Sequence, residues 1–335
     1  MIKKKKYIII FFLLFIIGVI ASLVIYSKKS TKNITKTFLL AETNSKDYVT
    51  TIADEYFARM VENKSGGKIK VKVYSDSELG DETTIASKIK DGSLAFGRIS
   101  VAPLAEYVDE INVLLLPYLF ESDDQMWDGL EGNLGSLLKE EMEEEDISFL
   151  AWYYSGSRSF YTKKNISKID DLQNLKIRVQ NSSLMYSMCE TLGCIPSFAD
   201  ENLIADEVKI DTLDGAENNI LIYYSYKQYE QCPYYIEDEH SRIPDVLIAS
   251  KKILSDLTDE ELMIIKECAK MAEIYEKNLW EKKEQEVKSF LKERNIKFIP
   301  VSPEEKSEMV NKFNILYDEF GNEYSDIISD IIINN

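Results

Sequence analysis

Two short stretches of the sequence combine residue types that suit the binding of an organic acid. The first, Lys176-Ile-Arg-Val-Gln180, places Arg178 in a short β-rich run, Leu175 to Gln180. The second, Asp214-Gly-Ala-Glu-Asn-Asn219, begins with a turn-forming Asp-Gly pair and then crowds polar side chains together. A guanidinium offers a planar fork of donors that matches a carboxylate, and a nearby Asn donates to an acid or a hydroxyl. Carboxylate binding is therefore one interpretation, and an ordinary ion pair of the strand Arg is the alternative.

Alternating strands and helices are predicted around these two stretches. The apolar periodicity indicates an α/β body with largely parallel sheets, and no internal repeat interrupts it. A single long helix without Gly or Pro is predicted from Thr258 to Asn295. The shorter predicted strands are Lys36–Ala41, Lys68–Tyr74 and Ala95–Ser100, and the shorter predicted helices are Lys46–Asn63, Asp81–Asp91, Ser122–Glu145, Leu184–Leu192 and a last helix within Asp326–Asn335.

Composition limits the partners of the chain. Its 335 residues exceed one ordinary core and suggest two lobes, and 45% apolar with 29% charged residues is usual for a globular body. The net charge of −18 argues against nucleic acid, whose binding needs a basic surface. An anionic ligand would require a locally basic site, because distant surface charges are screened beyond about 8 Å in physiological salt.

The first 35 residues are predicted to target the chain to the outside of the cell membrane. Lysines precede an uncharged run from Tyr7 to Tyr26, which matches the roughly 20 residues needed to span a bilayer. We favour a retained anchor with the N-terminus inside, followed by a polar tether from Ser27 to Thr35. A cleaved signal peptide is the alternative, with Ala21-Ser22 as a poor cleavage site.

The usual motifs of catalysis and metal binding are missing from the sequence. There is no P-loop, GxGxxG, GxSxG or HExxH motif, no CxxC pair, and His240 is the only histidine. We therefore predict no cofactor and no enzymatic activity, with acid–base chemistry by Asp or Glu as the alternative. The four cysteines are interpreted as buried free thiols, with two disulfides as the alternative.

The two stretches, with their surroundings, resemble the solute-binding proteins of tripartite ATP-independent periplasmic (TRAP) transporters of the DctP type. The likeness extends from Lys36 to Val301, nearly the whole chain outside the membrane segment. Further segments that carry it are Ser65–Tyr74, Glu78–Glu82, Asp91–Leu94, Leu116–Phe120, Pro244–Ile253 and Leu257–Glu261.

This resemblance implies a two-lobed periplasmic-binding-protein-like fold with a hinge and a long helix that spans both lobes. Lobe I would hold residues 36–156 and 246–283, and lobe II residues 157–245 and 284–335. The ligand would bind in the cleft between them. The expected function is capture of a carboxylate-bearing solute and its delivery to membrane permease subunits, by a monomer.

The resemblance also implies residues that contact the ligand. Arg178 matches the strand Arg that clamps the ligand carboxylate, and Asn218 matches an Asn that contacts the ligand. Glu217 beside it would contact the ligand or support the turn. Arg158 falls where many members carry a second basic residue at the hinge, with a hinge ion pair as the alternative.

Other positions are expected at the cleft. Glu82 lies where the family often places an acid facing the cleft, and a solvated acid at a helix N-terminus is the alternative. Arg98, a charge in an apolar strand, needs a partner and is placed in the cleft rather than the core. Asn44 follows the first strand in a loop of polar contacts. His240 would contact the ligand or serve the structure.

A hexuronate, D-glucuronate or D-galacturonate, is the expected ligand, because Arg, Glu, Asn and His together resemble members that bind sugar acids. Tyr223, Tyr224 and Tyr226 offer an aromatic face for a sugar ring, with core packing as the alternative. A dicarboxylate or another organic acid remains open within the family. So does a sensory ectodomain that acts through a separate partner.

Overall fold

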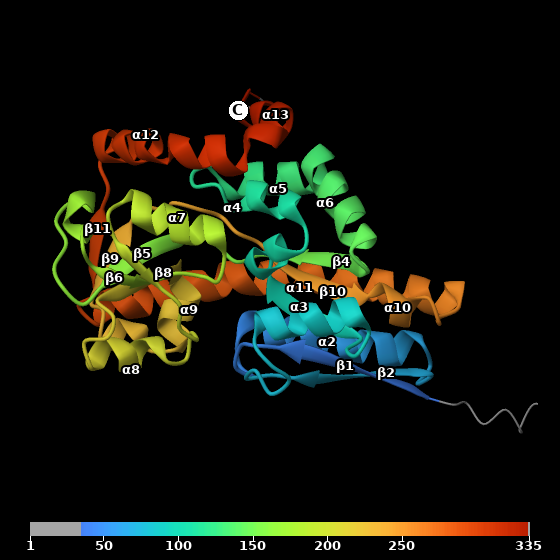
Figure 1. The fold of residues 1–335 in the computed structure, drawn as a ribbon. Helices are drawn as coiled ribbons and strands as arrows, with labels where there is room; N and C mark the ends of the chain where they lie inside the picture. Colours follow the sequence, from blue (N-terminus) through green and yellow to red (C-terminus); the bar gives the residue numbers. More distant parts are fainter. Residues whose placement is uncertain (1–34, 334–335) are drawn as a thin grey trace, which may run out of the picture.

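Two separate β-sheets form the centre of the computed structural model, which describes residues 35–333 (Figure 1). The first has the order β2 (Ile69–Tyr74), β1 (Lys36–Glu42), β3 (Phe96–Ser100), β10 (Asp245–Ser250) and β4 (Ile147–Tyr153). The second has the order β11 (Lys297–Pro300), β9 (Tyr234–Glu237), β5 (Arg158–Thr162), β8 (Gly215–Asn219), β6 (Lys176–Arg178) and β7 (Ile195–Ser197). The predicted α/β architecture is confirmed.

Each sheet contains one strand that runs against its neighbours. β10 is antiparallel to β3 and β4, and β5 is antiparallel to β8 and β9. The chain crosses from the first sheet to the second between β4 and β5, through residues 154–157, and returns between β9 and β10, through residues 238–244. The backbone N–H of Arg158 donates to the carbonyl of Ser241 at 2.8 Å, so the two crossing segments lie side by side.

The helix α11 (Asp259–Glu293) connects the two sheets along their length (Figure 1). Its 35 residues span about 50 Å at 1.5 Å per residue. Thr258 and Glu261 form a capping box that fixes its start. The helix contacts α2 (Val49–Lys64) and β4 on one side of the molecule and α9 (Ile220–Ser225) on the other. The predicted long helix that spans both halves is confirmed.

The middle of α11 packs against the first crossing segment. The rings of Trp280 and Tyr154 meet edge-to-face with centroids 5.5 Å apart, and Trp280 is fully buried. The buried Glu276 accepts a hydrogen bond from the Tyr154 backbone N–H at 2.9 Å. Gly156 adopts φ +65°, and a Cβ there would lie 3.3 Å from the Trp280 ring. A glycine is therefore favoured where the chain leaves the first sheet.

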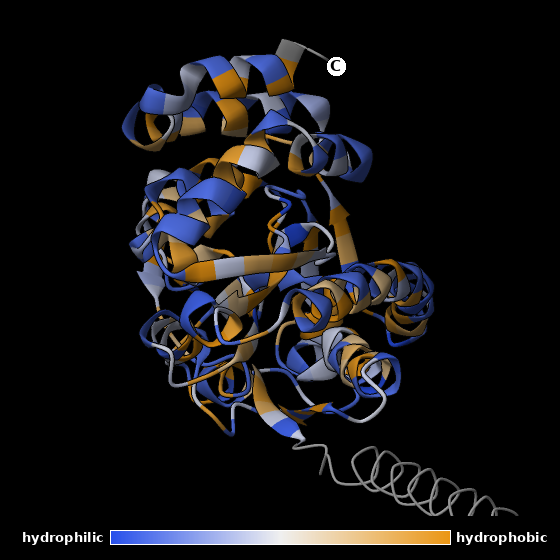
Figure 2. Ribbon diagram, turned by 90° about the vertical axis from the view of Figure 1, so that its right-hand side faces the viewer, coloured by the Kyte–Doolittle hydropathy of each residue, from blue (hydrophilic) through white to orange (hydrophobic). Residues whose placement is uncertain are grey.

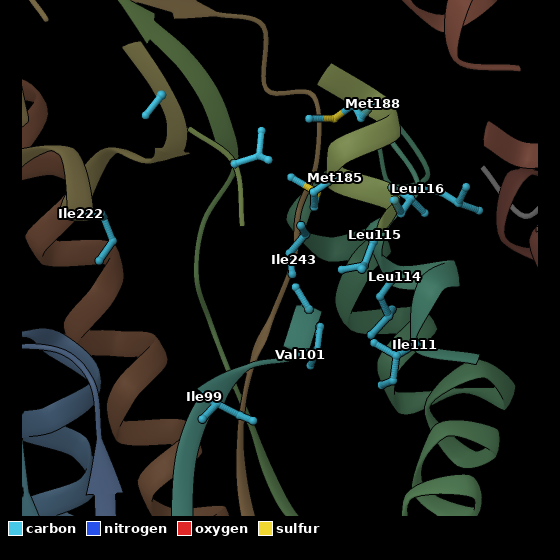
Figure 3. Close-up of a cluster of buried hydrophobic side chains, with 14 of the residues drawn as sticks. Ile99, Val101, Ile111, Leu114, Leu115, Leu116, Met185, Met188, Ile222 and Ile243 are labelled. Carbon is cyan, nitrogen blue, oxygen red and sulfur yellow. The ribbon is translucent and has the colours of Figure 1, made fainter. Parts of the chain in front are cut away.

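An apolar core joins the two halves above the sheets. Figure 3 shows Leu114 and Leu115 of α4 (Asn112–Leu115) beside Met185 and Met188 of α7 (Ser183–Thr191). Ile243, in the second crossing segment, lies among them. Helices carry apolar residues on one side and polar residues on the other (Figure 2). The remaining helices are α3 (Glu82–Asp91), α5 (Asp123–Glu131), α6 (Asn133–Glu144), α8 (Ile204–Lys209), α10 (Lys251–Leu254), α12 (Pro303–Phe320) and α13 (Ser325–Ile333).

The predicted element boundaries differ from the observed ones by a few residues. The largest departure is that a glycine divides the expected helix Ser122–Glu145 into α5 and α6, since Gly132 lies between them with ψ −148°. The apolar run before Pro117 forms the short helix α4. Between residues 35 and 333 no helix is long and apolar enough to cross a membrane. The predicted anchor, Tyr7–Tyr26, lies outside the described residues.

Candidate functional site

A cavity of about 760 Å³ lies between the two sheets. Loops and helix ends that follow β1, β2, β6 and β7 meet there, and so does the residue after α9. Carboxyl ends of parallel strands are the usual place for a ligand site in open α/β sheets. Its polar and charged lining residues are Thr43, Asp76, Ser77, Asp81, Glu82, Thr83, Thr84, Arg178, Gln180, Asn181, Asp200, Glu201, Asn202 and Tyr226.

Arg178, the last residue of β6, is the single cationic residue among those lining this cavity. In the sheet it faces Ser197 of β7 and Ala216 of β8, and neither residue is acidic. Its Nε donates to the Ala199 carbonyl at 2.9 Å. Its Nη1 is buried and has no hydrogen-bond partner among residues 35–333. A buried, unpartnered cationic donor beside a cavity is suited to receive an anion.

Glu201 and Asn218 complete the surroundings of this guanidinium. The Arg178 Nη1 lies 3.7 Å from the Glu201 Oε1, which is an ion-pair distance and too long for a hydrogen bond. The Asn218 Nδ2 donates to the same Oε1 at 2.9 Å. Asn218 is almost fully buried and lies behind Glu201 rather than on the cavity wall. The predicted pair of Arg178 and Asn218 is thus brought together at one carboxylate oxygen.

The strand arginine Arg98 lies outside the cavity wall, in a buried ion-pair cluster. It faces Glu42 across β1 and β3, and its Nε donates to Glu42 at 2.7 Å. Its Nη2 also contacts Glu42, and its Nη1 donates to Asp245 at 2.9 Å. Because Glu42, Asp245 and Thr43 accept its hydrogen bonds, Arg98 joins strands of the first sheet and the loop after β1 to one another, and these donors are not left for a ligand. The sequence placed Arg98 in the cleft, whereas the structure buries it beside these acids. A contact between Arg98 and a ligand stays a prediction.

Glu82, the first residue of α3, lies between Arg98 and the cavity. Its Oε1 accepts from the Ser100 backbone N–H at 2.8 Å and lies 3.6 Å from the Arg98 Nη1. Burial raises the pKa of Glu82 to about 7, although the Arg98 charge lowers it. Near neutral pH this carboxyl therefore exists in both protonation states, and it offers either a donor or an acceptor to the cavity.

Arg158, Glu217 and His240 form a second buried network at the crossing segments. β5 and β8 pair with Phe160 opposite Glu217, so Arg158 lies two positions along on the same face. The Arg158 Nε and Nη2 donate to the two Glu217 carboxylate oxygens at 2.7 and 2.8 Å, and its Nη1 donates to Asn218 at 3.0 Å. This bidentate pair uses the fork that a ligand carboxylate would need, and it corresponds to the hinge ion pair considered from the sequence.

His240 lies between two acids in this network. Its Nδ1 is 2.7 Å from the Asp238 Oδ2, and its Nε2 is 3.5 Å from the Glu217 Oε2. Burial lowers the pKa of His240, but the charges of Asp238 and then Glu217 outweigh it and raise the pKa to about 9. Burial raises the pKa of Glu217, but Arg158 and His240 outweigh it and lower the pKa to about 2. At neutral pH His240 is therefore protonated and carries a positive charge.

These pKa values predict that the protein loses stability as pH rises from about 6.5 to about 9. The folded pKa of His240 lies above its ordinary value of 6.5, so its contribution is complete below pH 6.5 and is lost as pH rises through 9. The difference between the two pKa values of His240 corresponds to a contribution on the order of 3 kcal/mol to the free energy of unfolding. Glu217 contributes in the opposite sense, with stability lost only as pH falls from about 4.5 through 2.

Urea unfolding of the wild type and of His240→Gln between pH 6.5 and 9 tests this expectation. The midpoint of the wild type should fall across this range, and the variant should start lower and fall less. Comparing the two proteins removes the contribution of groups that both share. Parallel curves for the two proteins would contradict a charged His240.

The cavity also contains residues that were not assigned to it from the sequence. Gln180 and Asn181 directly follow the strand Arg, and Glu201 lies in the loop after β7. Gln180 and Asn181 could have been assigned to the site because they directly follow the strand that carries Arg178. No feature of the sequence marks Glu201. Tyr226 lines the cavity and donates to the Asn44 Oδ1 at 3.4 Å, while Tyr223 is buried in the core. Asn44 itself is buried behind Tyr226 and also donates to Thr50.

Within residues 35–333 no group of three or more His, Cys, Asp or Glu residues is arranged to hold a metal ion. The four cysteines are free and buried, which agrees with their interpretation as buried thiols.

Comparison with known proteins identifies the family. Residues 40–323 match the model of the DctP family, described as bacterial extracellular solute-binding protein, family 7. The chain belongs to this family. A solute-binding protein of Chromohalobacter salexigens is 31% identical over 276 residues, which cover 82% of each chain.

Similar solved structures identify the class of transporter that such solute-binding proteins serve. A TRAP periplasmic solute-binding protein of Pseudomonas putida F1, with bound D-glucuronate, has a TM-score of 0.84 and 27% identity, covering 88% of this chain and 96% of its own. A TRAP periplasmic solute-binding protein of Sulfitobacter sp. NAS-14.1, with bound β-D-galacturonate, has a TM-score of 0.85 and 29% identity, covering 90% and 100%. The family and its structures confirm a TRAP-type solute-binding protein with a two-lobed fold, and a role in binding rather than catalysis.

Proposed function

We propose that this protein captures a hexuronate, D-glucuronate or D-galacturonate, in the cavity between the sheets and delivers it to TRAP permease subunits. The observation that carries the proposal is the Arg178 guanidinium, which lines the cavity and whose buried Nη1 has no hydrogen-bond partner among residues 35–333. The similar Pseudomonas and Sulfitobacter proteins hold D-glucuronate and β-D-galacturonate, respectively, which supports the same ligand class here.

The charge of the cavity supports one ligand carboxylate rather than two. Arg178 is the single cation of the lining, whereas Asp76, Asp81 and Glu82 are among its acids. Carboxylates repel a second negative charge but accept hydrogen bonds from hydroxyls. A singly charged, polyhydroxylated acid therefore fits better than a dicarboxylate. In this proposal Arg178 binds the ligand carboxylate, and Asp76, Asp81 and Glu82 accept from hydroxyls.

In the proposed capture, the two crossing segments act as the hinge between the lobes. The lobes, with the boundaries predicted from the sequence, close over the ligand by bending at residues 154–157 and 238–244, and the closed state is favoured because it binds the ligand better. Arg158, Glu217 and His240 support this hinge and hold Asn218 in place. We further propose that residues 1–35 retain the monomeric protein at the outer face of the cell membrane.

A thermal-shift screen of residues 36–335 tests the ligand class. D-glucuronate and D-galacturonate at 100 times their dissociation constants should stabilise the fold by about 2.7 kcal/mol and raise the melting temperature by about 4 °C. The panel includes aldonates, C4-dicarboxylates, sialic acid, amino acids and keto acids. A rise with dicarboxylates alone would overturn the uronate assignment, and no rise with any acid would overturn the proposal that the cavity receives an organic acid.

A further inference from the structure

The carboxylate of Glu201 lies where a bound acid would have to place its own carboxylate. The two donors of the site, the Arg178 Nη1 and the Asn218 Nδ2, converge on one oxygen, the Glu201 Oε1, at 3.7 and 2.9 Å. The other edge of the Arg178 fork is already used, because Nε donates to the Ala199 carbonyl. An incoming carboxylate that binds the Arg178 Nη1 and the Asn218 Nδ2 therefore has to displace the Glu201 carboxylate.

The backbone that carries Glu201 is fixed on both sides. Arg178 holds the Ala199 carbonyl, and the Gln228 Nε2 donates to the Glu201 carbonyl at 2.9 Å. Gln228 is fully buried, and its Oε1 accepts a hydrogen bond from the Tyr161 hydroxyl at 2.5 Å. The loop after β7 is thereby attached to the second sheet. The side chain of Glu201 is 23% exposed and lines the cavity, so it can rotate while its backbone stays in place.

The contacts of Glu201 are weaker than those that a ligand would form. Its Oε1 accepts one hydrogen bond from a neutral amide, and its distance of 3.7 Å from the guanidinium leaves the Arg178 Nη1 unsatisfied. A ligand carboxylate at about 2.7–2.9 Å from the same donors would form charge-assisted hydrogen bonds. The exchange of one carboxylate for another also keeps Asn218 paired throughout, so no buried amide is left without a partner.

We propose that Glu201 is a specificity-determining residue that occupies the carboxylate subsite until an acid displaces it. This inference rests on the proposed function and names one feature of the same site. Glu201 lowers the affinity for every acid by the cost of its displacement, and its charge, which remains near the cavity after rotation, disfavours a second negative charge on the ligand. The site thereby selects singly charged acids whose hydroxyls recover the lost affinity.

Isothermal titration with D-glucuronate compares the wild type with Glu201→Gln and Asp200→Asn. The Gln side chain keeps the size and the acceptor oxygen but removes the charge, so we expect binding about tenfold tighter than the wild type. Asp200 lies in the same loop and lines the same cavity, but no contact joins its side chain to Arg178 or Asn218 among the described residues. Asp200→Asn therefore measures the diffuse effect of removing one charge, which we expect to stay below about threefold.

Two further ligands separate the possible outcomes. Succinate, which carries two carboxylates, should gain more from Glu201→Gln than D-glucuronate does. Acetate at millimolar concentration serves as a bare carboxylate and reports on the subsite alone. Unchanged or weaker binding of D-glucuronate by Glu201→Gln, or equal gains for both variants, would overturn the inference. If no protein binds D-glucuronate, the uronate assignment fails, and the acetate titration still decides whether Glu201 competes for the subsite.

Discussion

Replacement of Arg178 by alanine is expected to weaken the binding of D-glucuronate at least about a hundredfold. Two charge-assisted hydrogen bonds of roughly 1.5–3 kcal/mol each are lost, and the cavity keeps no other cation among its described lining residues. Arg178→Lys should restore only part of the affinity, because an ammonium cannot form the planar fork. Titration calorimetry measures both variants against the wild type.

The controls for this prediction separate binding from folding. Arg59→Ala removes an exposed arginine of α2 that lies outside the cavity, and its affinity should match the wild type. Arg178→Ala also loses the hydrogen bond to Ala199, so a moderate fall in melting temperature is expected without a loss of the folded state. A folded Arg178→Ala protein whose affinity changes less than about threefold would show that the acid binds elsewhere.

Three strand arginines illustrate how much of the site is readable from the sequence. From the sequence all three are placed at the cleft or the hinge, Arg178 and Arg158 by the family resemblance and Arg98 as a charge in an apolar strand. Cross-strand register then separates them. Arg98 lies opposite Glu42, and Arg158 lies diagonal to Glu217, whereas Arg178 lies beside Ser197 and Ala216. The partners are distant in the chain, and their register depends on pairings that no single segment encodes.

The fold itself was more accessible because its signals are local. The long helix α11 is marked by its capping box and by an uninterrupted pattern without Gly or Pro, and its boundaries were predicted within two residues. By contrast, Glu201 sits in an irregular loop whose sequence resembles a solvated turn. Its position beside Arg178 follows from the parallel pairing of β6 with β7, a long-range property. Glu201 is thus missed because its neighbours in space are set by strand pairing and not by its own local sequence.

Breaking the buried pair of Arg158 and Glu217 is expected to destabilise the fold by about 3–5 kcal/mol. Glu217→Ala leaves the Arg158 guanidinium, which is 3% exposed, without its carboxylate, and it also removes an acid that holds the charged His240. The loss should appear as a lower urea midpoint with an unchanged slope. Asp211→Asn provides the comparison, because its ion pair with Lys163 is solvated and should contribute little, and Asn tolerates the positive φ of this position.

A double variant distinguishes an unpaired charge from lost packing. Arg158→Met combined with Glu217→Leu removes both charges together, and it should be more stable than Glu217→Ala alone because no buried ion remains uncompensated. Its remaining loss would come from Asn218, whose Oδ1 no longer accepts from Arg158 at 3.0 Å, and from His240. Because Asn218 also contacts Glu201, the double variant should bind D-glucuronate more weakly than Asp211→Asn does. Equal stability of Glu217→Ala and the wild type would show that the network is not what holds the crossing segments together.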